Sequence, residues 1–163
     1  MTKGIIIAAV ADNRVIGSDN RMPWERIPED MKRFRDLTLG RAVLMGRKTY
    51  QSLGKQLDGR LNVVLTKDNC AIPNNRNLLT TGSLNDAIRM CEDYRQYGTF
   101  YIIGGAEVYK QTIDLVDRME ITHVHQNPRG DTFFPSFDLA DWKKTASQVK
   151  NGYEFATYER REI

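Results

Sequence analysis

Four short hydrophobic runs lie along the first two thirds of the chain, at residues 5–10, 42–45, 61–65 and 100–103. None shows a sustained alternation of hydrophobic and polar positions, which predicts strands that are buried on both faces of a sheet. Helical patterns separate them, near residues 28–38, 47–53, 83–94 and 105–115. Strands that alternate with helices are typical of a mostly parallel sheet covered by helices on both faces.

The last third differs, because hydrophobic and polar positions alternate along residues 119–125 and 153–160. This pattern predicts longer, half-exposed strands that run antiparallel and close one edge of the sheet. We therefore expect an α/β fold: a mostly parallel central sheet of about eight strands, helices on both faces and an antiparallel C-terminal edge. The sequence has no repeats or interdomain linker, so residues 1–163 should form a single domain. Within it, residues from about 40 to 90 could move as a subdomain.

Composition narrows the class of protein. Hydrophobic residues make up 40% of the 163 positions and charged residues 28%, and the basic residues behind the net charge of +3 are spread along the chain. A nucleic-acid-binding protein would more often carry a basic run or stripe. A mildly positive enzyme, by contrast, favours the approach of anionic ligands.

Targeting and redox signals are weak. The first hydrophobic run is too short for a signal peptide, and no stretch approaches the ~20 residues that cross a bilayer. The two cysteines, Cys70 and Cys91, are too few and too far apart for a disulfide framework or a zinc site. We expect a cytoplasmic monomer without nucleic-acid or membrane partners.

A long segment, residues 11–24, separates the first predicted strand from the first predicted helix. Ligands bind at the carboxyl ends of parallel strands, so this segment lies where a site is expected. Gly17 and Asn20 offer pivot points, and Met22 and Trp24 offer hydrophobic cover. An ordinary surface loop also fits the pattern, but long loops without structure are usually functional or disordered, which favours a lid.

Asp30 lies in the first turn of the helix that we expect to begin at Pro28. Acidic side chains are favourable at helix N-termini, so a purely structural role would account for it. Asp30 nevertheless shares a helical face with Phe34 and Leu37. If that face packs inward, the carboxylate needs a strong donor, such as a ligand with an amidine-like pair of N–H groups.

Three predicted strands end in residues that suit phosphate groups: Gly-Arg-Lys-Thr at 46–49, Thr-Lys at 66–67 and Gly-Gly at 104–105. Helix starts present backbone N–H groups to anions, and glycine lets the backbone approach a ligand closely. A solvated basic helix start is the alternative for 46–49, although basic residues there oppose the helix dipole. Each of the other two strand ends, at 66–67 and at 104–105, is by itself a weak indication of a phosphate site. Three of them in one small chain favour a phosphate-bearing ligand.

Other catalytic motifs are absent from the sequence. It has no G-x-x-x-x-G-K-S/T phosphate-binding loop and no G-x-S-x-G nucleophile motif. Its histidines, His123 and His125, alternate on one predicted strand without a third metal ligand nearby, which favours structural or surface positions. We expect no metal site.

In order and spacing, the motifs resemble those of bacterial-type dihydrofolate reductases through nearly the whole chain. They are Val-Ile-Gly at 15–17, Met-Pro-Trp at 22–24, Pro-Glu-Asp at 28–30, Met-Gly-Arg-Lys-Thr at 45–49, Ile-Gly-Gly at 103–105 with Val-Tyr at 108–109, and Gly-Asp-Thr at 130–132 with Phe-Pro at 134–135. The resemblance implies NADPH-dependent reduction of 7,8-dihydrofolate to tetrahydrofolate, by hydride transfer to C6 and protonation at N5. This reaction supports one-carbon metabolism and thymidylate synthesis.

The resemblance also implies roles for single residues. Asp30 would hold the 2-amino group and ring nitrogen of the pteridine and favour protonation at N5, while Thr122 would support Asp30 by a hydrogen bond. Trp24 and Tyr109 complete the catalytic set. Arg60 would pair with the α-carboxylate of the glutamate tail. The implied substrate-binding residues are Ile7, Asp30, Met31, Phe34, Leu53, Arg60, Ile103 and Thr122.

For the cofactor, the resemblance implies that Arg47, Thr66 and Lys67 face the 2′-phosphate of NADPH. Residues 11–24 would be the lid, and the turn at 130–131 would brace its closed form. The implied cofactor-binding residues are Ala9, Ile16, Gly17, Asn20, Arg21, Met22, Gly46, Arg47, Lys48, Thr49, Ser52, Leu65, Thr66, Lys67, Gly104, Gly105, Ala106, Glu107, Val108 and Tyr109.

Two other functions fit parts of the pattern. A pyrimidine reductase of riboflavin synthesis shares the expected fold and cofactor but would not need Asp30, Phe34 and Arg60 at these places. A regulator that holds a nucleotide without chemistry would carry similar strand ends. Oxidation of NADPH that depends on dihydrofolate separates both from the reductase.

Overall fold

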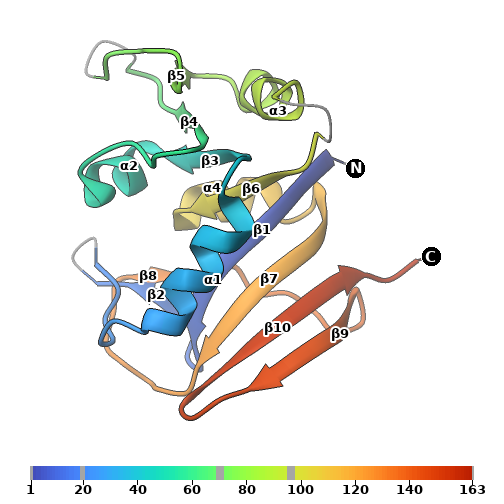
Figure 1. Ribbon diagram of the computed structural model, residues 1–163. Coiled ribbons are helices and arrows are strands. Elements are labelled where there is room, and N and C mark those ends of the chain that lie inside the picture. The colour runs from blue at the N-terminus through green and yellow to red at the C-terminus, as the bar shows by residue number, and fades with distance from the viewer. Residues whose placement is uncertain (1, 19–20, 69–71, 95–97, 163) are drawn as a thin grey trace.

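Eight strands form the central sheet in the described part of the chain, residues 2–18, 21–68, 72–94 and 98–162 of a computed structural model. They are β1 (Thr2–Ala11), β3 (Ala42–Gly46), β4 (Leu61–Leu65), β5 (Leu78–Thr81), β6 (Phe100–Gly104), β7 (Val116–Val124), β9 (Trp142–Val149) and β10 (Tyr153–Arg160). Their order is β5-β4-β3-β6-β1-β7-β10-β9 (Figure 1). The pairs from β5 to β7 are parallel, whereas β10 is antiparallel to β7 and to β9. The predicted α/β fold with an antiparallel C-terminal edge is confirmed.

Helices cover both faces of this sheet. On one face, Phe34 and Leu37 of α1 (Pro28–Thr38) and Tyr50 of α2 (Arg47–Leu53) pack against a buried cluster that includes Ile7 and Met45. On the other face, α3 (Leu84–Glu92) and α4 (Ala106–Thr112) pack against the main core. Consecutive strand residues point to opposite faces, so a strand between the two helix layers needs hydrophobic residues on both faces, as β1 has from Ile5 to Ala11.

The helix boundaries follow local chemistry. In α1, Pro28 occupies the first turn with Glu29 and Asp30, where a fixed φ and negative charge are both favourable. The Ser83 side chain caps α3 by accepting a hydrogen bond from the backbone N–H of Asp86. The helix α2 ends at Leu53, and its C-cap residue Gly54 has a φ of 76°, which suits glycine.

The prediction of half-exposed strands in the last third was wrong for β10 from Phe155 to Tyr158, which are all buried, and it was also wrong for β7. Its residues from Met119 to Thr122 are buried, and it lies in the interior of the sheet, parallel to β1. The polar positions in its alternation, Glu120 and Thr122, face partners in the protein rather than solvent. The exposed strand is β9, which had not been predicted and which forms the edge.

A small second ladder joins the predicted lid to the chain after β7. It pairs β2 (Val15–Gly17) with β8 (Thr132–Phe133), antiparallel. Both segments lie beside the same end of the main sheet (Figure 1). The ladder therefore fixes the first half of the lid segment.

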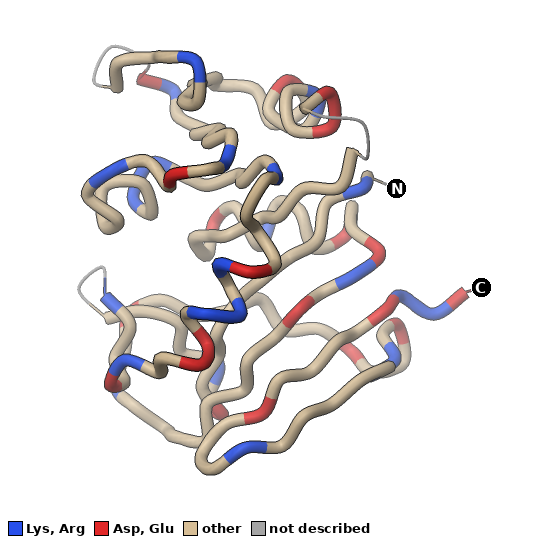
Figure 2. The backbone as a smooth tube through the Cα atoms, viewed as in Figure 1, with Lys and Arg blue, Asp and Glu red and all other residues tan. Residues whose placement is uncertain are grey.

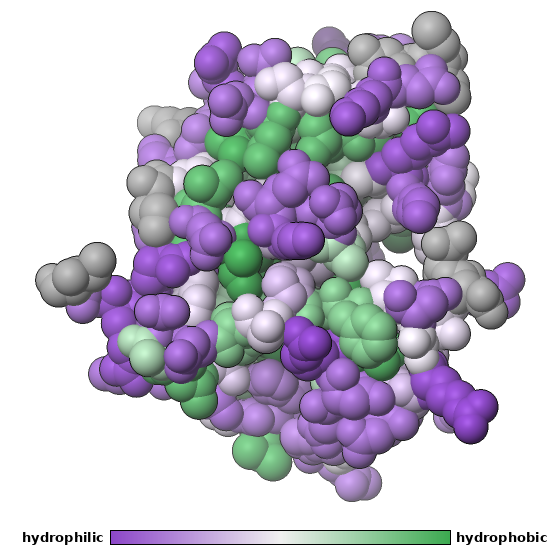
Figure 3. All heavy atoms as spheres, turned by 180° about the vertical axis from the view of Figure 1, so that it is seen from behind, coloured by the Kyte–Doolittle hydropathy of each residue, from purple (hydrophilic) through white to green (hydrophobic). Residues whose placement is uncertain are grey.

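The surface carries no single dominant feature. Basic and acidic residues are both distributed over the described chain (Figure 2). Seen from behind, hydrophobic side chains form separate patches among hydrophilic ones (Figure 3). Among the described residues, no helix is long and apolar enough to span a membrane, and no cluster could hold a metal ion. Cys91 is a buried free thiol, and Cys70 lies outside the described residues.

Candidate active site

Asp30 and Thr122 meet across the contact between α1 and β7. The Thr122 hydroxyl donates a hydrogen bond of 2.6 Å to Oδ1 of Asp30. Asp30 is half-buried, while Thr122 is buried between β1 and β10. The inward orientation of the Asp30 face, left open by the sequence, is thereby confirmed.

Burial raises the pKa of the Asp30 carboxyl above its ordinary value. The hydrogen bond from Thr122 and the positive charge of Arg33 act in the opposite direction and lower that pKa. A carboxylate that is partly removed from water gains most from a ligand that donates hydrogen bonds to it. The Asp30 carboxylate is therefore suited to a ligand group that carries several hydrogen-bond donors and a partial positive charge.

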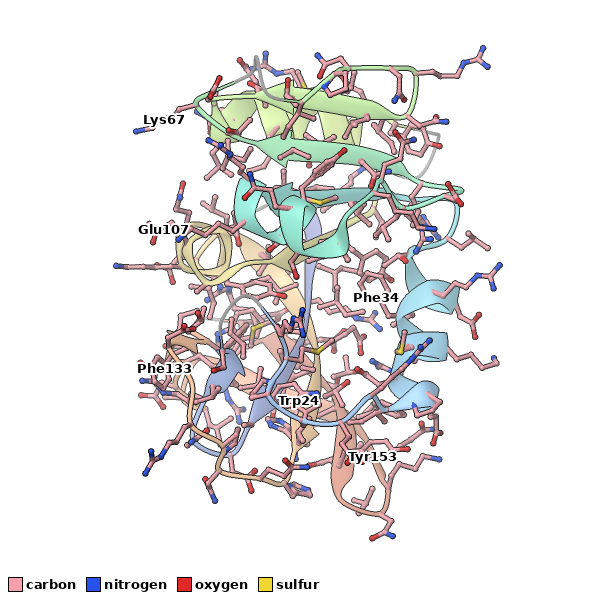
Figure 4. All side chains as sticks on the ribbon, turned by 90° about the vertical axis from the view of Figure 1, so that its left-hand side faces the viewer. Trp24, Phe34, Lys67, Glu107, Phe133 and Tyr153 are labelled. Atoms are coloured by element: carbon pink, nitrogen blue, oxygen red, sulfur yellow. The ribbon has the colours of Figure 1, made fainter. Side chains whose placement is uncertain are left out.

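Hydrophobic side chains that we expect to contact the substrate come from three elements, α1, β1 and β6. Phe34, Ile7 and Ile103 belong to one hydrophobic cluster. Viewed from the side, Phe34 extends from α1 toward the middle of the molecule, with Trp24 below it (Figure 4). Two further predicted substrate contacts, Met31 and Leu53, are exposed to 41% and 40%. The Met31 sulfur accepts a hydrogen bond from Nε of Arg26.

Arg60 is buried where the chain leaves a turn to enter β4. Its Nε donates to the carbonyl of Asp58, and its Nη1 donates to the hydroxyl of Thr38 at the end of α1. Burial lowers the pKa of this guanidinium, and the nearby charge of Arg35 lowers it further. These contacts fix the orientation of the guanidinium plane beside the C-terminal end of α1, where the Thr38 hydroxyl in turn donates to the carbonyl of Phe34.

The three strand ends predicted to suit phosphate lie side by side. In the sheet, β4, β3 and β6 are neighbours, with Gly46 opposite Leu65 and Met45 opposite Gly104. Lys48, Thr49 and Ser52 belong to α2, directly after β3, and Ala106 and Glu107 begin α4, directly after β6. The three strand ends that the sequence analysis treated separately therefore lie together at one edge of the sheet.

The backbone lies close to neighbouring side chains where these strand ends meet. A Cβ on Gly105 would stand 3.2 Å from Oγ1 of Thr49, and one on Gly46 would stand 3.1 Å from Cγ2 of Val108. Gly104 has a φ of 119°, which other residues rarely adopt, and the Gly104–Gly105 peptide bond is cis. Side chains larger than glycine would fill this junction.

Tyr109 connects α4 to the first strand. Its hydroxyl donates a 2.8 Å hydrogen bond to the carbonyl of Ile7, and its ring contacts Phe134 at 5.1 Å between centroids. Burial raises the pKa of the hydroxyl, so the side chain stays neutral. The structure gives Tyr109 a packing role beside the predicted site.

Charged side chains follow the C-terminal ends of β3 and β4. Arg47 is half-exposed, and its Nη1 lies 4.0 Å from Oδ2 of Asp68. Lys67 is exposed on the same side of the molecule as Glu107 (Figure 4). Thr66 is buried, and its hydroxyl exchanges hydrogen bonds with the backbone of Asp68. Leu65 packs against the main core.

The predicted lid packs on the sheet at both of its ends. Trp24 is buried with Val15 and Val124, and Ala9 lies against this cluster. Ile16 packs on the main core, and Arg21 pairs with Ser18. Met22 is 58% exposed. Asn20 lies outside the described residues.

The turn at 130–131 contacts the lid directly. The backbone N–H of Asp131 donates to the carbonyl of Gly17 at 3.1 Å, and the N–H of Phe134 donates to the carbonyl of Arg14 at 2.8 Å. A Cβ on Gly130 would come within 2.6 Å of the Gly17 carbonyl oxygen. Only glycine permits this approach without movement.

One group near Asp30 was missed by the sequence analysis. Glu120 lies two residues before Thr122 on β7 and is 2% exposed, with Arg33 of α1 as an ion-pair partner at 2.6 Å. The sequence had indicated no second acid beside Asp30. A signal was present, since Arg33 follows Asp30 by one helical turn and Glu120 shares a strand face with Thr122.

Comparisons with known proteins agree with this geometry. Residues 4–160 match the family model described as dihydrofolate reductase. The chain is 39% identical over 165 residues to dihydrofolate reductase HdrB of Haloferax volcanii, covering 97% of this chain and 84% of that protein. It is 35% identical over 164 residues to the dihydrofolate reductase of Bacillus subtilis, covering 95% and 93%.

A solved structure is similar over nearly the full length. It is dihydrofolate reductase from Enterococcus faecalis complexed with NADP(H) and RAB-propyl, with a TM-score of 0.84 and 29% identity, covering 98% of this chain and 96% of that one. The chain belongs to the dihydrofolate reductase family.

Proposed function

We propose that this chain reduces 7,8-dihydrofolate to tetrahydrofolate with NADPH, and that Asp30 is the carboxylate that binds the pterin. The observation that carries the assignment is the Asp30 carboxylate, which is half-buried and held by a hydrogen bond from Thr122. The 2-amino group and adjacent ring nitrogen of a pterin present two parallel donors. A carboxylate accepts such a pair with both oxygens, and the bonds strengthen when charge is involved.

The other residues around Asp30 would hold the ring and exclude water. Ile7, Phe34 and Ile103 supply hydrophobic walls from β1, α1 and β6. Met31 and Leu53 would contact the bound substrate from the exposed rim. Arg60 would receive the α-carboxylate of the glutamate tail, because a guanidinium fixed by two protein contacts loses little freedom on binding.

Asp30 would favour proton uptake at N5, next to the carbon that accepts the hydride. Its negative charge stabilises a protonated pterin electrostatically. Glu120 is unsuited to deliver that proton, since both of its oxygens accept hydrogen bonds from Arg33, Arg118 and Thr157. We infer that the proton reaches N5 through water.

The strand ends of β4, β3 and β6 fit a dinucleotide with phosphate groups. Glycines at 46, 104 and 105 leave room at the junction, and Arg47, Lys48 and Lys67 supply positive charge. Gly17 and Ile16 of the lid, Tyr109 and the first turn of α4 would line the nicotinamide side. When bound, NADPH supplies the hydride.

We further propose a cytoplasmic monomer in which residues from about 40 to 90 pivot as a subdomain. Exposed hydrophobic side chains are scattered, as expected for a chain without an obligate partner. The buried thiol of Cys91 suits a reducing compartment.

The decisive experiment is NADPH oxidation in the presence and absence of dihydrofolate, with product identification. We expect oxidation only with dihydrofolate and one tetrahydrofolate formed per NADPH consumed. Binding of both compounds without turnover would instead support a nucleotide-holding protein.

A further inference from the structure

Glu120 is a buried carboxylate that contacts none of the proposed ligand positions. Its Oε1 accepts hydrogen bonds from Nε and Nη2 of Arg118, at 2.9 and 2.7 Å. Its Oε2 accepts from Nη2 of Arg33 at 2.6 Å and from the Thr157 hydroxyl at 2.8 Å. Four donors satisfy both oxygens of a side chain that is 2% exposed, as a buried polar group requires.

The Arg33–Glu120 contact lies next to the Asp30–Thr122 contact and joins the same two elements. Arg33 follows Asp30 by three residues on α1, and Glu120 precedes Thr122 by two on β7, so each pair shares one face of its element. The Arg33 guanidinium also lies 4.8 Å from the ring centre of Phe155 on β10, which is paired with Thr122 on β7. Rotation of α1 would therefore break both contacts together.

Arg33 acts on Asp30 directly, and Glu120 acts through its pairing with Arg33. Arg33 stabilises the ionised carboxylate and lowers its pKa. Glu120 pairs with Arg33 and offsets part of that positive charge. Both are less screened than surface charges, because Arg33 is only 22% exposed and Glu120 almost completely buried.

We propose that Arg33 and Glu120 are positioning residues for the reduction: the pair orients α1 so that Asp30 faces the pterin, and the balance of its two charges sets how readily the site takes up the proton that the reaction consumes. The proposal rests on the role given above to Asp30. A pair that served only to stabilise the fold would change the amount of active enzyme and leave its pH dependence unaltered.

The remaining charged groups around Asp30 are few among the described residues. On α1, Glu29 accepts hydrogen bonds from the hydroxyl of Tyr153, on β10, and from Lys150, before β10. On β7, Arg118 contacts this network, and β1 presents only hydrophobic residues from Ile5 to Ala9. On β6, the buried Tyr101 lies within electrostatic reach of Glu120 and Arg33, and Arg41 acts on Tyr101 as well. Arg26 is directed toward Met31. None of these remaining groups is altered in the variants below.

The test measures single-turnover hydride transfer across pH, where the rate falls at alkaline pH because a proton must be taken up. In Arg33→Gln, the loss of a positive charge should move this decline to higher pH by roughly 0.5–1 unit. In Glu120→Gln, an uncompensated Arg33 should move it to lower pH by a similar amount. The double variant should return close to the wild-type profile.

Three controls distinguish the proposal from a structural effect. Arg33→Lys keeps the charge and should keep the wild-type profile even if its rate falls, which preserves the test if Glu120→Gln does not fold. Lys32→Gln removes a charge of the same sign from an exposed position of the same helix and should shift nothing. Carboxyl NMR of the ligand-free enzyme, assigned with Asp30→Asn, should show the Asp30 titration moving as the kinetic profile does.

Shifts of the same sign in Arg33→Gln and Glu120→Gln, or no shift in either, would overturn the proposal. Failure of the Asp30 assignment gives a different result. In that case Asp30→Asn alone would retain the wild-type pH profile and turnover.

Discussion

The Thr122 hydroxyl donates a 2.6 Å hydrogen bond to Oδ1 of Asp30, although the two residues are 92 positions apart. The bond joins the first turn of α1 to an interior strand and leaves the other carboxylate oxygen directed away from it. Because Thr122 contributes a neutral donor, it orients Asp30 without cancelling its charge. Asp30 can therefore act on a ligand as an oriented anion.

Replacing Asp30 with Asn should remove most turnover at neutral pH while preserving the fold. The amide can still accept the Thr122 hydrogen bond but lacks the charge that favours protonation at N5. Assistance of this kind is typically worth ~10²–10⁴-fold. The measurement is kcat with saturating NADPH and dihydrofolate at pH 7, with circular dichroism as the check on folding. Activity within a few-fold of the wild type would leave Asp30 as a helix-start acid.

The same substitution should stabilise the ligand-free protein at neutral pH. Burial raises the Asp30 pKa in the folded state, so the folded protein favours the neutral carboxyl and loses stability as pH rises through that pKa. Asn is neutral at every pH and does not incur this loss. Denaturant unfolding should give a larger free energy for Asp30→Asn than for the wild type at pH 7. The difference should shrink as pH falls through the raised folded-state pKa and be lost below the unfolded Asp pKa of ~3.9. Asp36→Asn, at an exposed position of α1, is the matched control.

Arg60 provides a test of the substrate tail. Arg60→Ala should weaken dihydrofolate by at least about 30-fold, because truncating one partner of a buried charge pair costs on the order of 2–5 kcal/mol. A dihydropterin without the glutamate tail should be affected far less. Arg60→Lys should recover part of the loss, since the charge returns without the planar fork. Equal losses for both substrates would assign Arg60 to its contacts with Thr38 and Asp58 alone.

Much of the fold could be predicted because hydrophobicity determines it. The runs at β1, β3, β4 and β6 are buried strands, and the helix expected from Pro28 begins there. The edge strand β9 was missed because its sequence, Trp-Lys-Lys-Thr-Ala-Ser-Gln-Val, is mostly polar and is held by backbone pairing with β10. The strand β5 was missed because its four residues are too few to show a periodic pattern.

The candidate site likewise contains residues that could be predicted from the sequence and residues that could not. Asp30 could be predicted only as one of two alternatives, because its spacing from Phe34 and Leu37 allows an inward face while a helix-start acid also explains it; the resemblance favoured the inward face. Glu120 could not be predicted, because a polar residue in an alternating strand normally indicates solvent exposure. Its burial depends on Arg33, 87 positions away in the sequence. A buried ion pair between distant elements has no local pattern.

The last prediction concerns the choice of cofactor. Arg47 follows Gly46 at the end of β3, next to the end of β4 with Lys67, so both cations could reach the 2′-phosphate that distinguishes NADPH from NADH. Charge-assisted hydrogen bonds are each worth roughly 1.5–3 kcal/mol, enough for about a tenfold preference. Arg47→Ala should therefore raise KM for NADPH and leave NADH nearly unchanged.

Asp68 makes this prediction sharper, because its carboxylate lies 4.0 Å from Arg47 and would repel a phosphate dianion bound there. Asp68→Asn should thus shift the kcat/KM ratio in favour of NADPH, opposite to Arg47→Ala. Both effects should shrink at high salt, since Arg47 and Asp68 are 44% and 56% exposed and are screened by ions. The measurement is kcat/KM for both cofactors in the three proteins, at low and high ionic strength. If both variants move the ratio in the same direction, the 2′-phosphate binds away from this pair of residues.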